Sequence, residues 1–82
     1  MPDDPVTAAQ QVADELHQRG HRQHAEHLRA SLLDRTEGAL LTAIRGACQT
    51  ILTAIEAIDP VSAGAVDELR LEVDKLIKAA RN

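Results

Sequence analysis

The clearest pattern in the chain is a series of apolar residues in segment 35–58, spaced alternately by three and four positions. Its members are Leu41, Ile44, Cys48, Ile51, Ile55 and Ile58. This spacing places them along one face of an α-helix, as in the seam of a coiled coil. Residues Asp34 to Glu37 form a capping box in which Asp replaces Ser or Thr, and Asp59-Pro60 ends the pattern. The sequence therefore predicts a long helix over 35–58.

A second long helix is predicted over 60–80, because an apolar stripe with the same spacing follows Pro60. The stripe consists of Val66, Leu69, Val73, Leu76 and Ala80. Lys75, Lys78 and Arg81 place positive charge near the end of this segment, where it favours the helix dipole. Two long helices joined by a short Asp-Pro connection predict an antiparallel hairpin.

Two shorter helices are predicted over 5–19 and 22–33. Asp4-Pro5 repeats the Asp-Pro start, and Gly20 after Arg19 is typical of a helix that ends in a left-handed residue. The first apolar face holds Val6, Ala9, Val12, Ala13 and Leu16, and the second holds Ala25, Leu28 and Leu32. No segment alternates as a strand does. We therefore expect an all-α fold, a small antiparallel bundle of four helical segments in one domain, 1–82, built on the C-terminal hairpin.

The predicted helix 35–58 carries a broad band of small residues on its other faces. The band consists of Ala39, Thr42, Ala43, Gly46, Thr50, Thr53, Ala54 and Ala57. Between Gly38 and Ala57 the only charged residues are Arg45 and Glu56. A helix that is small or apolar around most of its circumference is usually central. Gly46 costs about 1 kcal/mol relative to Ala inside a helix, so we expect another backbone to approach it closely.

The composition makes burial of this band by a second copy the favoured prediction. The chain has 82 residues and no Phe, Tyr or Trp, so its core lacks the largest apolar side chains. We expect a homodimer that uses the hairpin, with Thr42, Gly46, Thr50, Thr53 and Leu71 at the interface. In the alternative, a monomer, the two short helices fold over the band and Leu71 is a single exposed leucine.

All four histidines lie within eleven residues: His17, His21, His24 and His27. Solvated side chains near helix ends are the simplest interpretation. A metal site is an alternative, with His17, His21 and His24 as candidate ligands beside Asp14, Glu15 or Glu26. A contact that responds to pH is another, because imidazoles titrate near neutrality.

The Arg/His-rich segment 17–35 also raises the possibility of a DNA-associated regulator. Two short helices joined by a glycine turn are superficially similar to a helix-turn-helix. Residues 16–36 hold four Arg against two carboxylates, but the chain as a whole has a net charge of -4. An acidic remainder opposes phosphate, so nucleic acid is the less favoured partner.

The sequence predicts no enzyme and no cofactor, because it has no phosphate-binding loop and Cys48, its one cysteine, falls in the apolar seam. The carboxylates of 60–80, Asp67, Glu68, Glu72 and Asp74, predict a solvated face or a docking surface for a basic partner. No run is long enough to span a membrane and no signal peptide is recognisable, so we expect a cytoplasmic protein. The favoured function is a small non-enzymatic interaction or assembly module, an adaptor or regulator.

Overall fold

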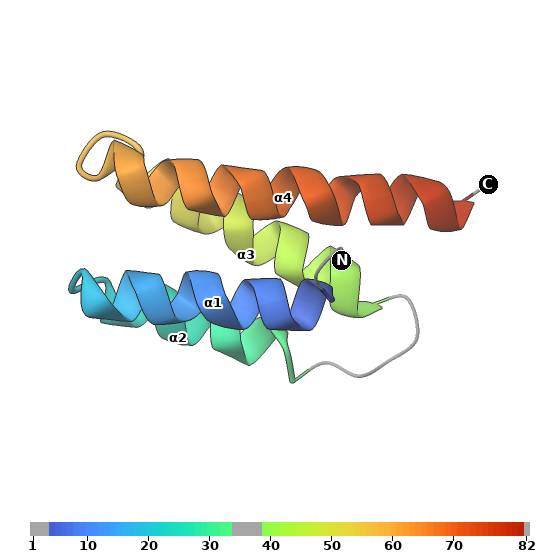
Figure 1. Ribbon diagram of the computed structural model, residues 1–82, viewed down its shortest axis with the longest axis horizontal. Coiled ribbons are helices and arrows are strands. Elements are labelled where there is room, and N and C mark those ends of the chain that lie inside the picture. Colours follow the sequence, from blue (N-terminus) through green and yellow to red (C-terminus); the bar gives the residue numbers. More distant parts are fainter. Residues whose placement is uncertain (1–3, 34–38, 82) are drawn as a thin grey trace.

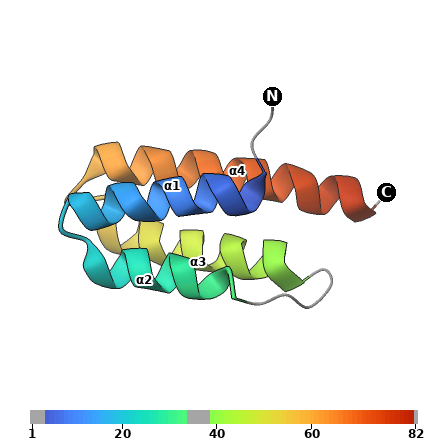
Figure 2. The same cartoon turned by 60° about the horizontal axis from the view of Figure 1, so that its bottom comes forward.

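The computed structural model describes residues 4–33 and 39–81, and over these residues the chain is all-α, with four helices and no strand. The helices are α1 (Pro5–Gln18), α2 (Arg22–Ser31), α3 (Ala39–Ile55) and α4 (Pro60–Arg81). Successive helices run in opposite directions, so that α1 and α2 form one hairpin and α3 and α4 form another (Figure 1). Seen from below, α1 lies beside α4 and α2 lies beside α3 (Figure 2). The helices therefore surround one core in the order α1, α2, α3, α4.

The core is closed within a single chain and is built from aliphatic residues of all four helices. Its buried members are Ala9, Ala13, Leu16, Ala25, Leu28, Leu32, Ile44, Ala47, Cys48, Ile51, Ile55, Ala63, Val66, Leu69 and Val73. The inward positions of α1 and α2 are largely alanine, and such small side chains allow helix axes to approach closely. The chain thus forms a buried core without any aromatic side chain.

The turn between α1 and α2 has the predicted left-handed residue. Gly20 has a φ of 89°, a conformation that a residue with a Cβ rarely adopts. The amide of His21 donates to the carbonyl of Leu16 at 2.8 Å, which closes the end of α1. This hydrogen bond places the side chain of His21 next to the start of α4, a position that matters for the site described below.

Two predicted helix ends differ from the structure by two or three residues. α2 ends at Ser31 and leaves Leu33 exposed, and α3 ends at Ile55 and leaves Ile58 exposed in the following turn. The amides of Ile58 and Asp59 both donate to the carbonyl of Ile55, so the chain turns toward α4 before the apolar pattern finishes. The predicted start of α3 and its capping box, residues 34–38, lie outside the described residues.

The predicted apolar stripe of α4 is wrong at its C-terminal end. Leu76 and Ala80 are exposed, whereas Ile77 packs against the core. A repeat of alternating threes and fours has a period of 3.5 residues, and a straight α-helix drifts about 20° from it in every heptad. Three turns beyond Val66, position 77 therefore faces the core more directly than position 76.

The last turns of α4 extend beyond the other three helices (Figure 1). Among the described residues, no helix combines the length and apolar character that a membrane span requires.

Candidate interaction surfaces

The outward face of α3 contains four of the five residues that the sequence predicts at an interface. Thr42, Gly46, Thr50 and Thr53 are all exposed, and we call them the α3 stripe. At 100° per residue, they lie on the side of α3 opposite Ile44 and Ile51, which are fully buried. None of the four is charged, although they face solvent in the single chain.

The expected burial of α3 on both sides is wrong within one chain. Most of the small-residue band is exposed, and only Ala39 and Ala43 are half-buried. A Cβ at Gly46 would meet no atom within 4 Å among the described residues. Within residues 4–33 and 39–81, no backbone therefore makes the close approach that the sequence predicts at Gly46.

The hydroxyl groups of the stripe are largely satisfied by their own helix. Thr50 Oγ1 donates to the carbonyl of Gly46 at 3.1 Å, and Thr53 Oγ1 donates to the carbonyl of Gln49 at 3.0 Å. Covering these threonines would leave no donor stranded, so the usual cost of burying a hydroxyl is small here. The α3 stripe can be removed from water by another protein surface.

Leu71, the fifth predicted interface residue, lies on a separate surface. Its side chain is 45% exposed on the outer face of α4. Arg45 of α3 and Asp74 of α4 form an ion pair of 3.4 Å that bridges the two helices. At 100° per residue, Thr42 lies about 60° from Arg45 around α3, and Leu71 lies about 60° from Asp74 around α4. A hydrogen bond from Lys78 and the nearby Arg45 guanidinium hold the pKa of Asp74 below its usual range. The stripe and Leu71 thus do not form one continuous apolar patch.

A polar cluster of Arg19, His21, Asp59 and Ser62 joins the α1–α2 turn to the start of α4; we call it the Asp59 cluster. His21 Nε2 donates to Asp59 Oδ2 at 2.9 Å, and Ser62 Oγ donates to the same oxygen at 2.7 Å. The Ser62 amide and Arg19 Nη1 reach Asp59 Oδ1 at 3.1 and 3.2 Å. These donors, first His21 and then Ser62, lower the pKa of Asp59 far below its ordinary value. The Asp59 carboxylate therefore links the α1–α2 turn to the turn that precedes α4.

The structure does not assemble the candidate metal ligands. His17 is exposed, His21 is directed at Asp59, and the ring of His24 lies 6.2 Å from that of His21. Within residues 4–33 and 39–80, no group of three or more His, Cys, Asp or Glu side chains is placed to hold a metal ion. The sequence identifies Asp59 only as part of the Asp-Pro connection between two helices, and nothing local to either segment signals its contact with His21.

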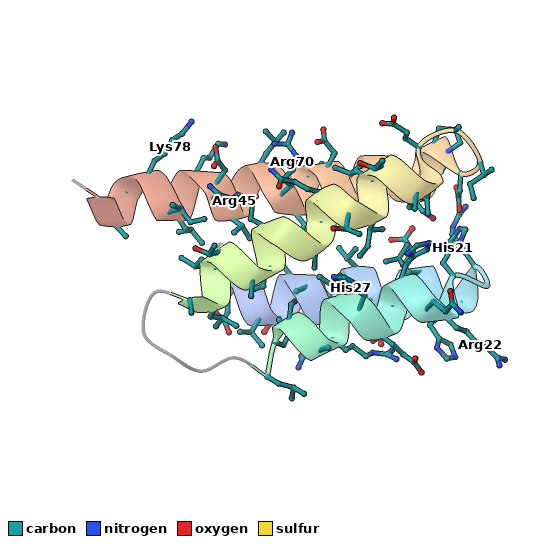
Figure 3. The ribbon with its side chains drawn as sticks, turned by 180° about the vertical axis from the view of Figure 1, so that it is seen from behind. His21, Arg22, His27, Arg45, Arg70 and Lys78 are labelled. Carbon is teal, nitrogen blue, oxygen red and sulfur yellow. The ribbon has the colours of Figure 1, made fainter. Side chains whose placement is uncertain are left out.

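The basic segment 17–35 is partly neutralised by the chain itself. Arg19 contacts Asp59 and, at 3.9 Å, Glu15, and Arg29 Nη2 lies 2.6 Å from Asp14 Oδ1. Arg22 points away from the bundle (Figure 3). Two of the three arginines that the structure describes in this segment therefore face carboxylates of their own chain.

Cys48 is a core residue, as its place in the apolar seam predicts. It is fully buried, and burial raises the pKa of its thiol to about 12, against a smaller opposing effect of Arg70. Burial therefore disfavours the thiolate, which is the form in which a cysteine acts as a nucleophile.

No protein-family model, curated protein or solved structure matches this chain. The α3 stripe, the Asp59 cluster and the grooves between helices are therefore interpreted from their own chemistry.

Proposed function

We propose that the protein is a small non-enzymatic interaction and assembly module that forms a homodimer through the α3 stripe. The observation that carries the proposal is the uncharged, exposed α3 stripe around Gly46, which distinguishes this glycine from Gly64 of α4, where Asp67 and Glu68 lie one turn away. Glycine in a helix interior costs about 1 kcal/mol relative to alanine, and the described chain has open space for a Cβ at this position. A second copy packed on the stripe would explain why glycine stands here, because a residue without a Cβ lets another backbone approach closely.

The stripe suits contact with its own copy. In a two-fold symmetric dimer the same surface meets itself, so both sides must be compatible with close packing and free of like charges. Thr42, Gly46, Thr50 and Thr53 meet both conditions, and they span roughly 16 Å along α3 at 1.5 Å per residue. A stable interface commonly buries about 800 Å² per partner, more than one helix face provides, so we expect a dimer that dissociates on dilution.

The engagement of Arg19 and Arg29 with carboxylates of their own chain supports this proposal over a DNA-associated regulator. The turn of His21 toward Asp59 likewise supports it over a metal-binding protein.

Sedimentation equilibrium over a concentration series tests the proposal. Wild type should move from the monomer mass of 8.9 kDa toward twice that value as concentration rises. Gly46→Gln should raise the melting temperature, because it removes a helical glycine, and should weaken association by about tenfold, because the new side chain blocks close approach.

Gly64→Gln is the matched control. Gly64 also lies inside a helix with open space for a Cβ, but on α4. This variant should gain stability without any change in association. A protein that stays at the monomer mass into the high micromolar range, or equal weakening by the two substitutions, would contradict the proposal.

A further inference from the structure

A shallow groove of about 200 Å³ runs between α1 and α4. Its apolar part is formed by Ala8, Val12, Ala65 and Leu69, and Gln11, Glu68 and Glu72 border it. These two helices lie side by side on one face of the bundle, and α3 lies below them in the view of Figure 2. The groove is therefore a different surface from the α3 stripe.

Two exposed large apolar residues lie on α4 on either side of the residues that line the groove. Val61 is 62% exposed and Leu76 is 41% exposed. At 100° per residue, Val61, Ala65 and Leu76 lie within about 60° of one another, so both exposed residues are on the same side of α4 as the groove residue Ala65. With a rise of 1.5 Å per residue, the distance from Val61 to Leu76 is about 22 Å, which corresponds to four helical turns.

The border of the groove is acidic and poorly neutralised. Glu68 and Glu72 are one helical turn apart, a spacing at which like charges repel each other. Glu68 forms no ion pair with the described residues, and Glu72 has only a 3.5 Å contact with Lys75, where both side chains are largely exposed. A cation from outside the chain would relieve this repulsion.

We propose that the groove binds an amphipathic helix of another protein, with an apolar stripe about four turns long and Lys or Arg beside it. A groove between two packed helices accepts the side-chain ridge of a third, and recognition of this kind uses apolar anchors at helical spacing. The acidic border selects for cations at the edge of the ligand helix and disfavours the phosphates of nucleic acid or anionic lipid. The inference rests on the proposed function only in treating the protein as an interaction module, and it does not require self-association.

Fluorescence anisotropy with two labelled 18-residue peptides tests the inference. Both peptides carry Leu at the same helical spacing, and one has Lys and the other Glu at the remaining positions. The Leu/Lys peptide should bind at least about tenfold more tightly than the Leu/Glu peptide. The double variant Glu68→Lys, Glu72→Lys should lose about tenfold in affinity for the Leu/Lys peptide.

The double variant Glu26→Lys, Glu56→Lys controls for overall charge. It changes the net charge by the same amount through exposed residues outside the groove, and it should leave the affinity nearly unchanged. Equal losses of affinity in the two double variants would show only general charge attraction and would overturn the proposal that the groove binds the peptide.

A second pair of variants tests the apolar anchor. Leu76→Ala should weaken binding of the Leu/Lys peptide about fivefold, whereas Leu71→Ala should not. Both leucines belong to α4 and are similarly exposed, at 41% and 45%, but they lie about 140° apart around the helix. Equal affinities for the two peptides, or equal effects of the two leucine variants, would overturn the inference.

The same protein samples separate this inference from the proposed dimer. Peptide binding by a protein that sediments as a monomer would support the groove and contradict the α3 stripe. A dimer that binds neither peptide would support the stripe and overturn the groove.

Discussion

The helices α1 and α4 begin with nearly the same sequence, yet their first residues have different roles. Residues 4–8 read Asp-Pro-Val-Thr-Ala, and residues 59–63 read Asp-Pro-Val-Ser-Ala. Both starts place proline at the first helical position, and the backbones agree: the amides of Ala8 and Ala63 donate to the carbonyls of Asp4 and Asp59 at 2.9 and 3.0 Å. The local sequence is therefore sufficient to start a helix at both places.

The side chains of the two aspartates differ completely. Asp4 is exposed and caps none of the first amides of α1, whereas Asp59 accepts hydrogen bonds from the amide and the hydroxyl of Ser62 and from His21. The residue three positions after each aspartate shows the cause. Thr7 is exposed, but Ser62 is only 1% exposed, because it lies one turn before the buried Val66 on the core-facing side of α4. The side chains at the start of a helix are held in place by tertiary hydrogen bonds when a second element packs against it.

Asp59→Ala should produce the largest loss of stability in this comparison. The substitution removes the shared acceptor of His21, Ser62 and Arg19 and leaves the part-buried groups without their partner. We expect a melting temperature several degrees lower, measured by circular dichroism at 222 nm and pH 7. Asp4→Ala, at the equivalent position of α1, should change it little, and equal losses would show that both aspartates act only as local caps.

Lowering the pH should remove the same contribution without a substitution. The pKa of Asp59 is lower in the folded protein than in the unfolded chain, so its contribution is complete above the unfolded value of about 4 and is lost as pH falls below it. The difference in melting temperature between wild type and Asp59→Asn should be present at pH 5 and should shrink as the pH falls below 4. A difference that stays constant down to pH 2 would exclude the ionised carboxylate as its source.

His21→Ala should have the next largest effect. Its imidazole is 17% exposed and donates to an ionised carboxylate, so we expect a loss of roughly 1–2 kcal/mol in the free energy of unfolding, measured by urea denaturation. His27, which is exposed on α2, is the control. The variant His27→Ala should stay within about 0.5 kcal/mol of wild type, and a similar loss in both variants would contradict the role of the Asp59 cluster.

Of the paired substitutions at the two helix starts, Ser62→Ala and Thr7→Ala should give the smallest difference in the free energy of unfolding. Ser62→Ala removes a buried hydroxyl and its 2.7 Å hydrogen bond to Asp59, for a loss of about 1 kcal/mol by urea denaturation. Thr7→Ala, at an exposed position, should fall within about 0.5 kcal/mol of wild type. The comparison fails if Thr7→Ala costs as much as Ser62→Ala.

The errors at the helix ends show where periodicity stops being a guide. The seam of α3 is buried at Ile44, Cys48, Ile51 and Ile55, as predicted, but Ile58 is exposed because the chain has already turned toward α4. On α4 the strict repeat predicts Leu76, and the straight helix instead packs Ile77. Spacing identifies the buried face of a helix over about three turns but not the point where its neighbours end.

The candidate surfaces, too, are only partly predictable from local sequence. The charge-free face of α3 is evident from Thr42, Gly46, Thr50 and Thr53, but that it faces solvent within one chain depends on which side the other helices occupy. The groove between α1 and α4 combines Val12 with Leu69, residues far apart in the chain whose proximity no local pattern encodes.

The sequence by itself determined the all-α class, the four helices, the left-handed glycine at position 20 and most of the inward positions. These features depend on hydrogen bonds and side-chain neighbours within about four residues, and such interactions are recorded directly in residue spacing. Only the tertiary structure decided that His21 meets Asp59, 38 positions away, that Asp4 caps nothing and that Leu71 is separated from the α3 stripe. Each of these depends on how one helix is placed and rotated against another, which the period of a single helix does not specify.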